Sequence, residues 1–261
     1  MIELKPRLEG KVAIVAGAGS QGSVMGNGKA TAILFAREGA QVILADSVEK
    51  RALDTLEVIT AEGGTASVFV ADVTKAADCS SLAEAAVQRY GRLDILHNNV
   101  GIGGSGSVVD VSEPDWDRVM VVNLKSMMLT SKYAIPHMVA GGGGAIVNIS
   151  SISAVRPRGL TPYSVSKGGV IALTQAMAID HARDRIRVNC IMPGPVCTSM
   201  VARNLTDERR ETRRLASPLE IEGTAWDVAW AAVYLASDQA RWVTGVILPV
   251  DGGVTIASPD R

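Results

Sequence analysis

The chain has 261 residues, of which 47% are apolar and 20% charged, and its formal net charge is −1. This length and composition allow a sizeable core and exclude a disordered chain. The low net charge, together with only two Phe, four Tyr and four Trp, argues against a nucleic-acid or membrane-surface partner.

The three cysteines and three histidines are scattered and lack metal-ligand spacing. We therefore expect no metal site, and an odd set of unpaired thiols is typical of a reducing cytoplasm. No apolar stretch approaches the ~18–20 residues of a membrane span, and the N-terminus lacks the apolar run of a signal peptide. The sequence predicts a soluble, cytoplasmic protein.

Strand-like and helix-like segments alternate along the chain. Residues 12–16 are a short, continuously apolar run, typical of a strand buried on both faces of a parallel sheet. A glycine-rich turn at 17–28 and a helix at 29–38 follow it. Further strands are expected at 41–45, 66–71, 93–97, 145–149, 186–191 and 246–250. Further helices are expected at 48–61, 75–90, from 114 into 123–139, 162–183 and 224–236.

This alternation predicts an α/β fold: a Rossmann-type doubly wound parallel β-sheet of about seven strands, flanked by helices on both faces. We expect a single domain over residues 1–261, because no repeat or linker divides the chain. Ligands on such sheets bind at the carboxyl ends of the strands. Polar or glycine-rich residues follow the predicted strands at that edge: the 17–28 turn, Asp46, Asp72, Asn99, Ser151, Pro193 and Gly194.

The strand, glycine-rich turn and helix at residues 12–38 have the order that a dinucleotide fingerprint requires. Glycines permit the tight turn and let the backbone approach a pyrophosphate at the helix N-terminus. Asp46 ends the second strand, where a carboxylate accepts hydrogen bonds from the adenosine ribose and repels a 2′-phosphate. We therefore expect NAD rather than NADP. The nearby cations that would serve a phosphate instead are Lys29, Lys50 and Arg51.

Tyr163 and Lys167 are four residues apart, and Pro162 stands where a helix can begin. Both side chains would then share one face of its first turns. Bringing a phenol from a pKa of ~10 to roughly 7 needs about 4 kcal/mol of preferential stabilisation of the phenolate. A close ammonium and a cationic cofactor ring would supply it. A hydroxyl upstream, Ser151 or Ser150, would hold the substrate oxygen.

With these motifs in view, the chain resembles the short-chain dehydrogenase/reductase family over essentially its whole length. The matching pieces occur in the family's order: the 17–28 turn, Asp72-Val73, Asn98-Asn99-Val100-Gly101, Asn123, Ser150-Ser151, Tyr163-x-x-x-Lys167, Pro193-Gly194 and Val250-Asp251-Gly252-Gly253. The resemblance implies an NAD-dependent oxidoreductase that interconverts a secondary alcohol and a ketone by hydride transfer.

The resemblance also implies roles for individual residues. Tyr163 would be the general acid/base, and Lys167 would bond the nicotinamide ribose and depress the pKa of Tyr163. Ser151, preferred to Ser150 because only one of the two should face the cleft, would polarise the substrate oxygen. Asn123 would hold a relay water. The expected cofactor-binding residues are Gly17, Gly19, Ser20, Asn27, Gly28, Asp46, Asp72, Val73, Asn99, Val100, Gly101, Tyr163, Lys167, Pro193, Gly194, Val196 and Thr198.

The chain departs from the family pattern in three places. Residues 21–25 look like an insertion in the usual Gly-x-x-x-Gly-x-Gly spacing, Ala16 replaces a threonine, and Ser151 precedes Tyr163 by 12 residues rather than 13. Three alternative functions remain. They are an NAD(P)H-dependent 3-oxoacyl thioester reductase, an enoyl reductase, whose Tyr and Lys are spaced more widely, and a non-catalytic cofactor-sensing Rossmann protein.

The resemblance places a substrate lid at about 195–222 and further pocket walls at 102–107 and 152–160. Apolar side chains there suggest an apolar or cyclic alcohol: Val155, Leu160, Met200 and Val201. Arginines there would instead meet a carboxylate or phosphate, or simply be solvated: Arg156, Arg158 and Arg203. The resemblance further implies a homotetramer, with the apolar helices at 123–139 and 162–178 as candidate interfaces.

Overall fold

The computed structural model describes residues 5–202 and 205–258. In this part of the chain one parallel sheet has seven strands, in the order β3-β2-β1-β4-β5-β6-β9. The strands are β1 (Val12–Ala16), β2 (Gln41–Asp46), β3 (Ala66–Val70), β4 (Ile95–Asn98), β5 (Gly144–Ile149), β6 (Ile186–Pro193) and β9 (Ile247–Val250). The predicted doubly wound α/β fold is confirmed, and the strand order reverses between β1 and β4.

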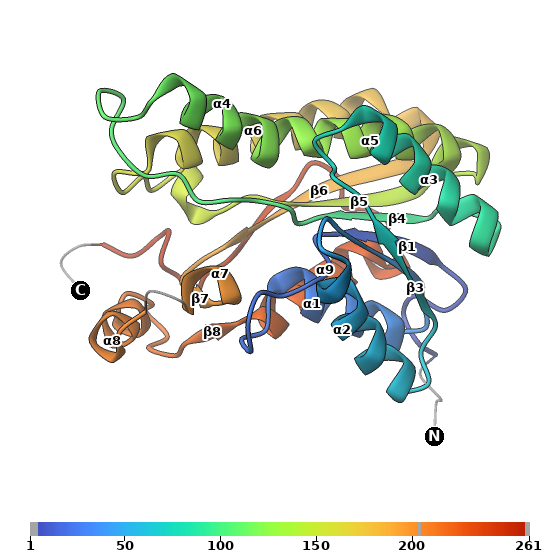
Figure 1. Ribbon diagram of the computed structural model, residues 1–261, viewed down its shortest axis with the longest axis horizontal. Helices are drawn as coiled ribbons and strands as arrows, with labels where there is room; N and C mark the ends of the chain where they lie inside the picture. Colours follow the sequence, from blue (N-terminus) through green and yellow to red (C-terminus); the bar gives the residue numbers. More distant parts are fainter. Residues whose placement is uncertain (1–4, 203–204, 259–261) are drawn as a thin grey trace.

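Helices cover both faces of the sheet (Figure 1). On one face lie α1 (Asn27–Arg37), α2 (Glu49–Ala61) and α9 (Ala225–Ala236). On the other lie α3 (Ala76–Tyr90), α4 (Glu113–Met120), α5 (Ser126–Ala140) and α6 (Thr161–Asp180). The sheet is therefore the middle of three layers.

The apolar run of β1 shows why the strand is hydrophobic throughout. Ala13 and Val15 pack into the core beneath α1 and α9, whereas Ile14 and Ala16 pack into the core beneath α3 and α5. Successive side chains of a strand point to opposite faces, and here both faces are buried. Each strand thus contributes to two cores at once.

Element ends differ from the sequence expectation by a few residues. The helix predicted at 29–38 begins at Asn27, directly after the last turn of the glycine-rich segment. The helix predicted to reach residue 183 ends at Asp180, and a 3-10 turn (Ala182–Asp184) follows. The strand predicted to end at 191 extends to Pro193.

The segment expected to form a lid has regular structure. β7 (Val196–Cys197) pairs with β8 (Gly223–Thr224), and between them lie α7 (Ser199–Ala202) and α8 (Asp207–Leu215). In α8 the N-cap Thr206 accepts a hydrogen bond from the Arg209 backbone, acidic residues occupy the first turn and arginines the last, as the helix dipole favours. Arg203 and the side chain of Met200 lie outside the described residues.

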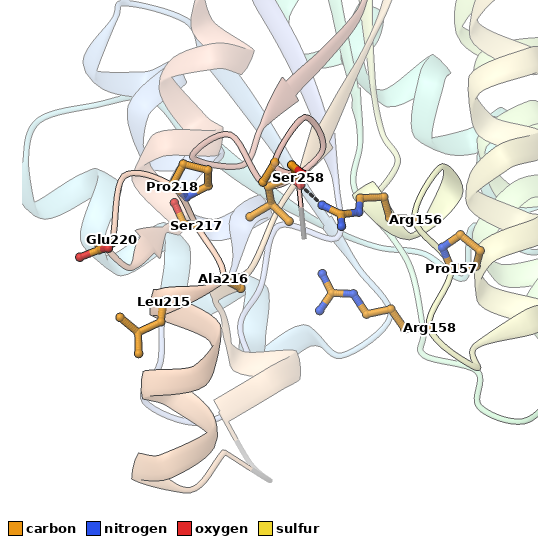
Figure 2. A pocket seen from close by; sticks show the side chains of 11 residues that line it. Arg156, Pro157, Arg158, Leu215, Ala216, Ser217, Pro218, Glu220 and Ser258 are labelled. Atoms are coloured by element: carbon orange, nitrogen blue, oxygen red, sulfur yellow. Dashed lines mark hydrogen bonds between the residues drawn. The ribbon is translucent and has the colours of Figure 1, made fainter. Parts of the chain in front are cut away.

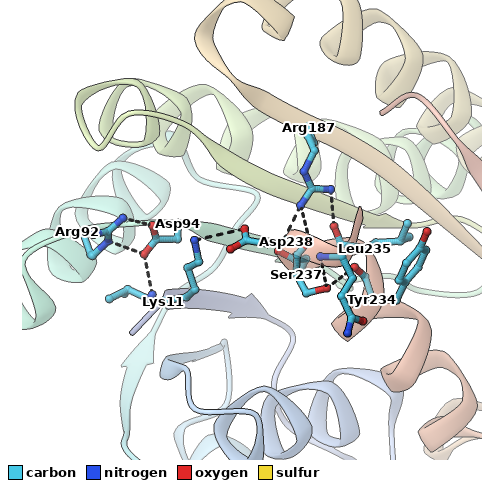
Figure 3. A network of polar contacts seen from close by, with 11 residues as sticks. Lys11, Arg92, Asp94, Arg187, Tyr234, Leu235, Ser237 and Asp238 are labelled. Carbon is cyan, nitrogen blue, oxygen red and sulfur yellow. Dashed lines mark hydrogen bonds and ion pairs between the residues drawn. The ribbon is translucent and has the colours of Figure 1, made fainter. Parts of the chain in front are cut away.

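The amino ends of the central strands are joined by ion pairs and hydrogen bonds (Figure 3). The Asp94 carboxylate accepts from the Val12 backbone at 2.8 Å and from two guanidinium nitrogens of Arg92 at 2.8 and 2.6 Å. Lys11 lies 3.6 Å from Asp238. Arg187 donates to the backbone carbonyls that end α9, those of Leu235, Ala236 and Ser237. These contacts tie the sheet to α9 at the edge opposite the glycine-rich turn.

Candidate active site

Glycines in the turn between β1 and α1 stand where no side chain fits. A Cβ atom on Gly28 would lie 1.9 Å from the Gly17 carbonyl oxygen and 2.6 Å from the side-chain nitrogen of Asn99. Gly17 has φ of +80°, a backbone conformation that favours glycine. The Asn99 amide donates to the Gly17 carbonyl at 3.1 Å. The end of β4 therefore holds the turn in its tight shape.

The five residues that interrupt the glycine spacing form an excursion whose two ends meet. The backbone N–H of Gly26 donates to the hydroxyl of Ser20 at 2.7 Å. The chain thus returns to its starting point after residues 21–25, and Gly26 and Gly28 follow Ser20 in space as they would without the insertion. Gly26 also adjoins the segment expected to form a lid, because a Cβ atom on Gly26 would lie 3.3 Å from the Ser199 hydroxyl.

Asp46 ends β2 beside this turn. One carboxylate oxygen accepts from the Gly19 backbone at 3.1 Å and the other from the Val48 backbone at 2.9 Å. A Cβ atom on Gly19 would lie 2.8 Å from the Asp46 carboxylate and 2.4 Å from the Arg51 Cβ. Val48 is the N-cap of α2, so Asp46 supports the turn before the helix and is not its cap. The negative charge sits directly against the glycine-rich turn.

The other predicted cofactor residues also follow strands at the carboxyl edge. Asp72 and Val73 come after β3, and the Asp72 carboxylate accepts from the Thr74 hydroxyl and backbone, which lowers its pKa. Gly194 follows β6, and its N–H donates to the Val250 carbonyl at 2.9 Å. Val100 follows β4, Pro193 ends β6, Val196 begins β7 and Thr198 follows β7.

Tyr163, Lys167 and Ser151 are brought together by α6 and the end of β5. Tyr163 and Lys167 lie one turn apart near the start of α6, with the ammonium 5.8 Å from the centre of the phenol ring. The Lys167 ammonium donates to the Ile149 carbonyl at 2.8 Å. The Ser151 hydroxyl lies beside the Tyr163 phenol, whose pKa it lowers, and it accepts a hydrogen bond from the Ser153 backbone at 3.1 Å. The neighbouring Ser150 is engaged elsewhere, since its hydroxyl donates to the Lys167 carbonyl at 2.7 Å.

The pKa values in this cluster are governed first by burial. Burial raises the pKa of the Tyr163 phenol, and the Ser151 hydroxyl beside it lowers it part of the way back. Burial lowers the pKa of Lys167 to about 8. The depression of the Tyr163 pKa that the sequence suggested is therefore not produced by the protein side chains in this structure. It requires a further positive charge in the cleft.

Asn123 occupies a π-helical turn (Val121–Lys125) that interrupts the α4–α5 helix. Its side chain is fully buried and bonds both backbone groups of Ile102, at 2.7 and 2.9 Å, and the Ser166 hydroxyl at 3.0 Å. A Cβ atom on Gly101 would lie 3.4 Å from the Lys167 ammonium and 3.5 Å from the Asn123 side-chain oxygen. Asn123 thus fixes the loop after β4 against α6. Single π turns of this kind are frequent at functional sites.

A buried polar network beneath the cleft was not anticipated from the sequence. Asn98 donates to Asn148 at 2.9 Å and accepts from Thr130 at 2.7 Å, and Asn148 donates to Thr174 at 3.0 Å. Ser166, which bonds Asn123 and the Tyr163 carbonyl, was also missed. The available signal was Asn148 inside the otherwise apolar β5 and Asn98 at the end of β4, because buried amides need partners.

A cavity of about 560 Å³ opens beside the segment that follows Ser151 (Figure 2). Arg156 and Arg158 form one wall and the end of α8 another, and Val254 belongs to a third. Of the predicted pocket residues, Arg156 and Arg158 line this cavity, whereas Val155 is exposed at the surface and is not among its lining residues.

The residues at the carboxyl edge fit a bound dinucleotide. The first turn of α1 has no side-chain cap, so its N–H groups are available to a pyrophosphate. The side-chain oxygen of Asn27 is buried and accepts no hydrogen bond from the described residues. The Lys167 ammonium has three donors, and Ile149 accepts one of them. Glycines keep side chains out of the space between these groups.

Two absences apply to residues 5–202 and 205–258. Within them, no helix is long and apolar enough to cross a membrane. Nor do three or more His, Cys, Asp or Glu side chains gather there in a way that could hold a metal ion.

Each comparison with known proteins finds dehydrogenases or reductases. A family model described as enoyl-(acyl carrier protein) reductase matches residues 22–255. The 3-oxoacyl-[acyl-carrier-protein] reductase of Thermotoga maritima is 41% identical over 253 residues, which are 96% of this chain and 100% of that protein. A crystal structure described as a short-chain dehydrogenase/reductase from Burkholderia xenovorans aligns with a TM-score of 0.93 and 40% identity over 97% of this chain and 99% of that one. A 7α-hydroxysteroid dehydrogenase complexed with NADH and 7-oxo-glycochenodeoxycholic acid aligns with a TM-score of 0.89 and 37% identity, over 95% and 96% of the two chains.

Proposed function

Because the chain belongs to the short-chain dehydrogenase/reductase family of oxidoreductases, whose members use nicotinamide cofactors, we propose that it interconverts a secondary alcohol and a ketone with NAD. The observation that carries the proposal is the nearness of three groups: the Tyr163 phenol, the Ser151 hydroxyl beside it, and the Lys167 ammonium 5.8 Å from the centre of the phenol ring. When bound, the nicotinamide supplies hydride transfer.

The protein's own part in the reaction is to move one proton. Tyr163 takes the hydroxyl proton of the alcohol during oxidation and returns it during reduction. Ser151, which lies beside the phenol, donates to the same substrate oxygen and holds it within reach of Tyr163. Lys167 is held by Ile149 and Asn123 holds the facing loop, so the ammonium stays fixed beside the phenol.

Charge in the cleft makes the phenol a usable base. Its raised pKa in the structure reflects burial of a group that would be negative when ionised. Lys167 in its protonated form, together with the positive charge of an oxidised nicotinamide, would stabilise the phenolate. Since the pKa of Lys167 is about 8, this support is present below that pH and weakens above it.

Turnover of secondary alcohols with NAD, in wild type and in Tyr163→Phe, tests the proposed reaction. The phenylalanine ring keeps the shape but has no proton to exchange, so we expect kcat to fall roughly 10²–10⁴-fold while NAD binding, measured by calorimetry, is retained. Equal and negligible turnover by both proteins, with NAD still bound, would instead favour a cofactor-sensing role.

Asp46 supports the preference for NAD. Its carboxylate lies against Gly19, where a 2′-phosphate would bring negative charge onto negative charge. We expect Asp46→Ala to reduce the ratio of kcat/KM with NAD to that with NADP by roughly tenfold, which is about 1.4 kcal/mol. An unchanged ratio would mean that another group discriminates between the cofactors.

Reduction of a 3-oxoacyl thioester is the second candidate, supported by the 41% identity to a protein of that name. The chemical step and its residues would be the same. Asp46 disfavours the phosphorylated cofactor on which biosynthetic reductions usually draw. An enoyl reductase, which the description of the matching family model names, fits less well, because the hydroxyl of Ser151 and the i,i+4 spacing of Tyr163 and Lys167 suit an alcohol oxygen.

We also propose a homotetramer in the cytoplasm. Exposed apolar side chains on the outer helices support an interface between copies, among them Met128 and Val139 on α5, Val165 and Ile179 on α6, and Trp230 and Tyr234 on α9. Three free thiols, Cys79, Cys190 and Cys197, are compatible with a reducing compartment. Sedimentation equilibrium of the purified protein would give the assembly state directly.

A further inference from the structure

The cavity beside the candidate active site is enclosed by segments that are distant in the sequence (Figure 2). Arg156 and Arg158 come from the loop after β5, Leu215 and Ser217 from the end of α8, and Val254 from the segment after β9. Its volume of about 560 Å³ is within the range of sites that hold small ligands.

Arg158 has no partner of its own within the part of the chain that the structure describes, where it makes no hydrogen bond and no ion pair. In Figure 2 its guanidinium extends into the space below Arg156 and faces the end of α8. Arg156, in contrast, donates to the Val254 carbonyl. Arg156 therefore holds the C-terminal segment in place, and Arg158 is left available to a ligand.

A second arginine, Arg213, lies in α8, in the segment expected to form a lid. Two of the α8 arginines are neutralised, since Arg210 pairs with Glu222 and Arg214 with Glu211. Arg213 is different: it is half-buried and donates to the Val196 carbonyl at 3.2 Å, and no carboxylate in the described residues forms an ion pair with it. Burial and the nearby positive charge of Arg158 both lower its pKa.

The carboxylate of Glu222 acts on Arg213, but it pairs with Arg210 and does not line the cavity. Glu220 lines the cavity, but Figure 2 shows its carboxylate pointing away from the arginines. Asp251 is engaged by the backbone of Gly253 and Thr255 and by the Thr255 hydroxyl. Arg158 therefore faces the cavity with no carboxylate of the cavity lining pointing toward it, and a guanidinium group in that position can bind an anion.

The cavity is one layer of side chains away from the proposed chemistry. Val254, in its wall, packs in a single apolar cluster with Ile152 and Met192. Ile152 directly follows Ser151, and Met192 precedes Pro193. A substrate whose carbinol carbon lies at Ser151 and Tyr163, and whose chain passes Ile152, would reach Arg158.

We infer that Arg158 forms an anion subsite in this cavity, with Arg213 adding positive charge from outside its lining, and that the subsite binds a carboxylate or phosphate group that the substrate carries at a distance from its reacting carbon. That the anion belongs to a substrate rests on the proposed function, whereas anion binding at this cavity does not. Guanidinium groups suit both anions because they donate two parallel hydrogen bonds. A wholly neutral cyclic alcohol would leave the Arg158 guanidinium without an anion.

Calorimetric titration tests the subsite without turnover. The probes are hexanoate, hexyl phosphate and neutral hexanamide, which share one chain length. We expect wild type to bind at least one anion roughly tenfold more tightly than hexanamide, and the tighter anion identifies the chemical class. Arg158→Gln should remove this preference, and Arg213→Gln should weaken it. Arg209→Gln, an exposed α8 arginine outside the cavity, is the matched control and should keep it.

Kinetics then connect the subsite to the reaction. With 5-hydroxyhexanoate, 5-hydroxyhexyl phosphate and 5-hydroxyhexanamide, we expect Arg158→Gln to lower kcat/KM for the favoured anion roughly tenfold and to leave the amide within about twofold. The subsite is overturned if wild type binds the amide as well as the anions, or if the preference survives in Arg158→Gln. Preferential anion binding without turnover of any alcohol would contradict the proposed function and leave the subsite standing.

Discussion

The two edges of the central sheet differ in how completely their polar groups are satisfied. At the amino edge, Asp94 has three donors, from the Arg92 guanidinium and the Val12 backbone, and Arg187 bonds the carbonyls that end α9. At the carboxyl edge, Lys167 is buried with a lowered pKa, and the side-chain oxygen of Asn27 has no partner among the described residues.

The difference shows how one fold serves both stability and chemistry. Groups that bond one another stabilise the folded chain, whereas groups held apart from partners are available to a ligand. Positions that break the rules of a well-satisfied interior are where function is expected. Substitutions at the carboxyl edge should therefore lower activity with little loss of stability. Substitutions at the amino edge should lower stability with little loss of activity.

Lys167→Met should give the largest contrast. The lysine pKa is about 8 in the folded chain, against 10.5 for the unperturbed group. Between these pH values the unfolded chain binds more protons, so stability rises with pH there and the penalty is fully present below pH 8. Removing the charge should stabilise the cofactor-free protein at pH 7 by about 3 kcal/mol and lower kcat roughly 10³-fold.

Urea unfolding from pH 7 to 10.5 measures the first effect, and steady-state kinetics the second. The stability advantage of Lys167→Met over wild type should shrink between pH 8 and 10.5, because the other groups that titrate in this range are common to both proteins. A variant that is less stable than wild type at pH 7 would show that the ammonium is satisfied by the protein, and the contrast between the edges would be lost.

Ser151→Ala and Ser150→Ala form a matched pair of neighbouring residues. The Ser151 hydroxyl lies beside the Tyr163 phenol, whereas that of Ser150 donates to the Lys167 carbonyl and is buried. We expect Ser151→Ala to lower kcat roughly 10²-fold with little change in stability. Ser150→Ala should destabilise by about 1–2 kcal/mol and change kcat only a few-fold. The reverse outcome in paired kinetic and unfolding measurements would assign the substrate oxygen to Ser150.

Gly28→Ala tests the shape of the glycine-rich turn. Its added methyl group would lie 1.9 Å from the Gly17 carbonyl oxygen, so the turn must shift. Such overpacking costs about 1–3 kcal/mol, and we expect NAD affinity to fall by about 5–150-fold when measured by calorimetry. Gly168→Ala is the control, because a Cβ atom there has no neighbour within 4 Å. Unchanged affinity in Gly28→Ala would place the dinucleotide away from this turn.

Asp94→Asn tests the amino edge and should have the smallest effect. The substitution keeps the side-chain size but weakens the bidentate pairing with Arg92, whose side chain is about half exposed (47%). We expect a loss of about 1–2 kcal/mol in the free energy of unfolding, with kcat and KM unchanged at a temperature where the protein stays folded. A selective loss of kcat would show that the two edges are coupled.

The sequence by itself determined the fold class, the position of the chemistry-bearing residues directly after strands, and the placement of Tyr163 next to Lys167. Each of these follows from short-range regularities: apolar runs of strand length, helical spacing of four residues, and glycines directly after a strand. The turn of α6 that carries Tyr163 and Lys167 needs no distant contact to bring the two onto one face.

Only the tertiary structure decided which polar groups have hydrogen-bond partners. The closure of residues 21–25 by Ser20, the Asn98–Asn148 bond and the bond from Arg213 to the Val196 carbonyl each depend on how the chain packs around the site. The engagement of Ser150 by the Lys167 carbonyl likewise joins two separate elements. Local patterns do not specify such contacts, because burial and hydrogen bonding between distant segments arise only when the whole chain is packed.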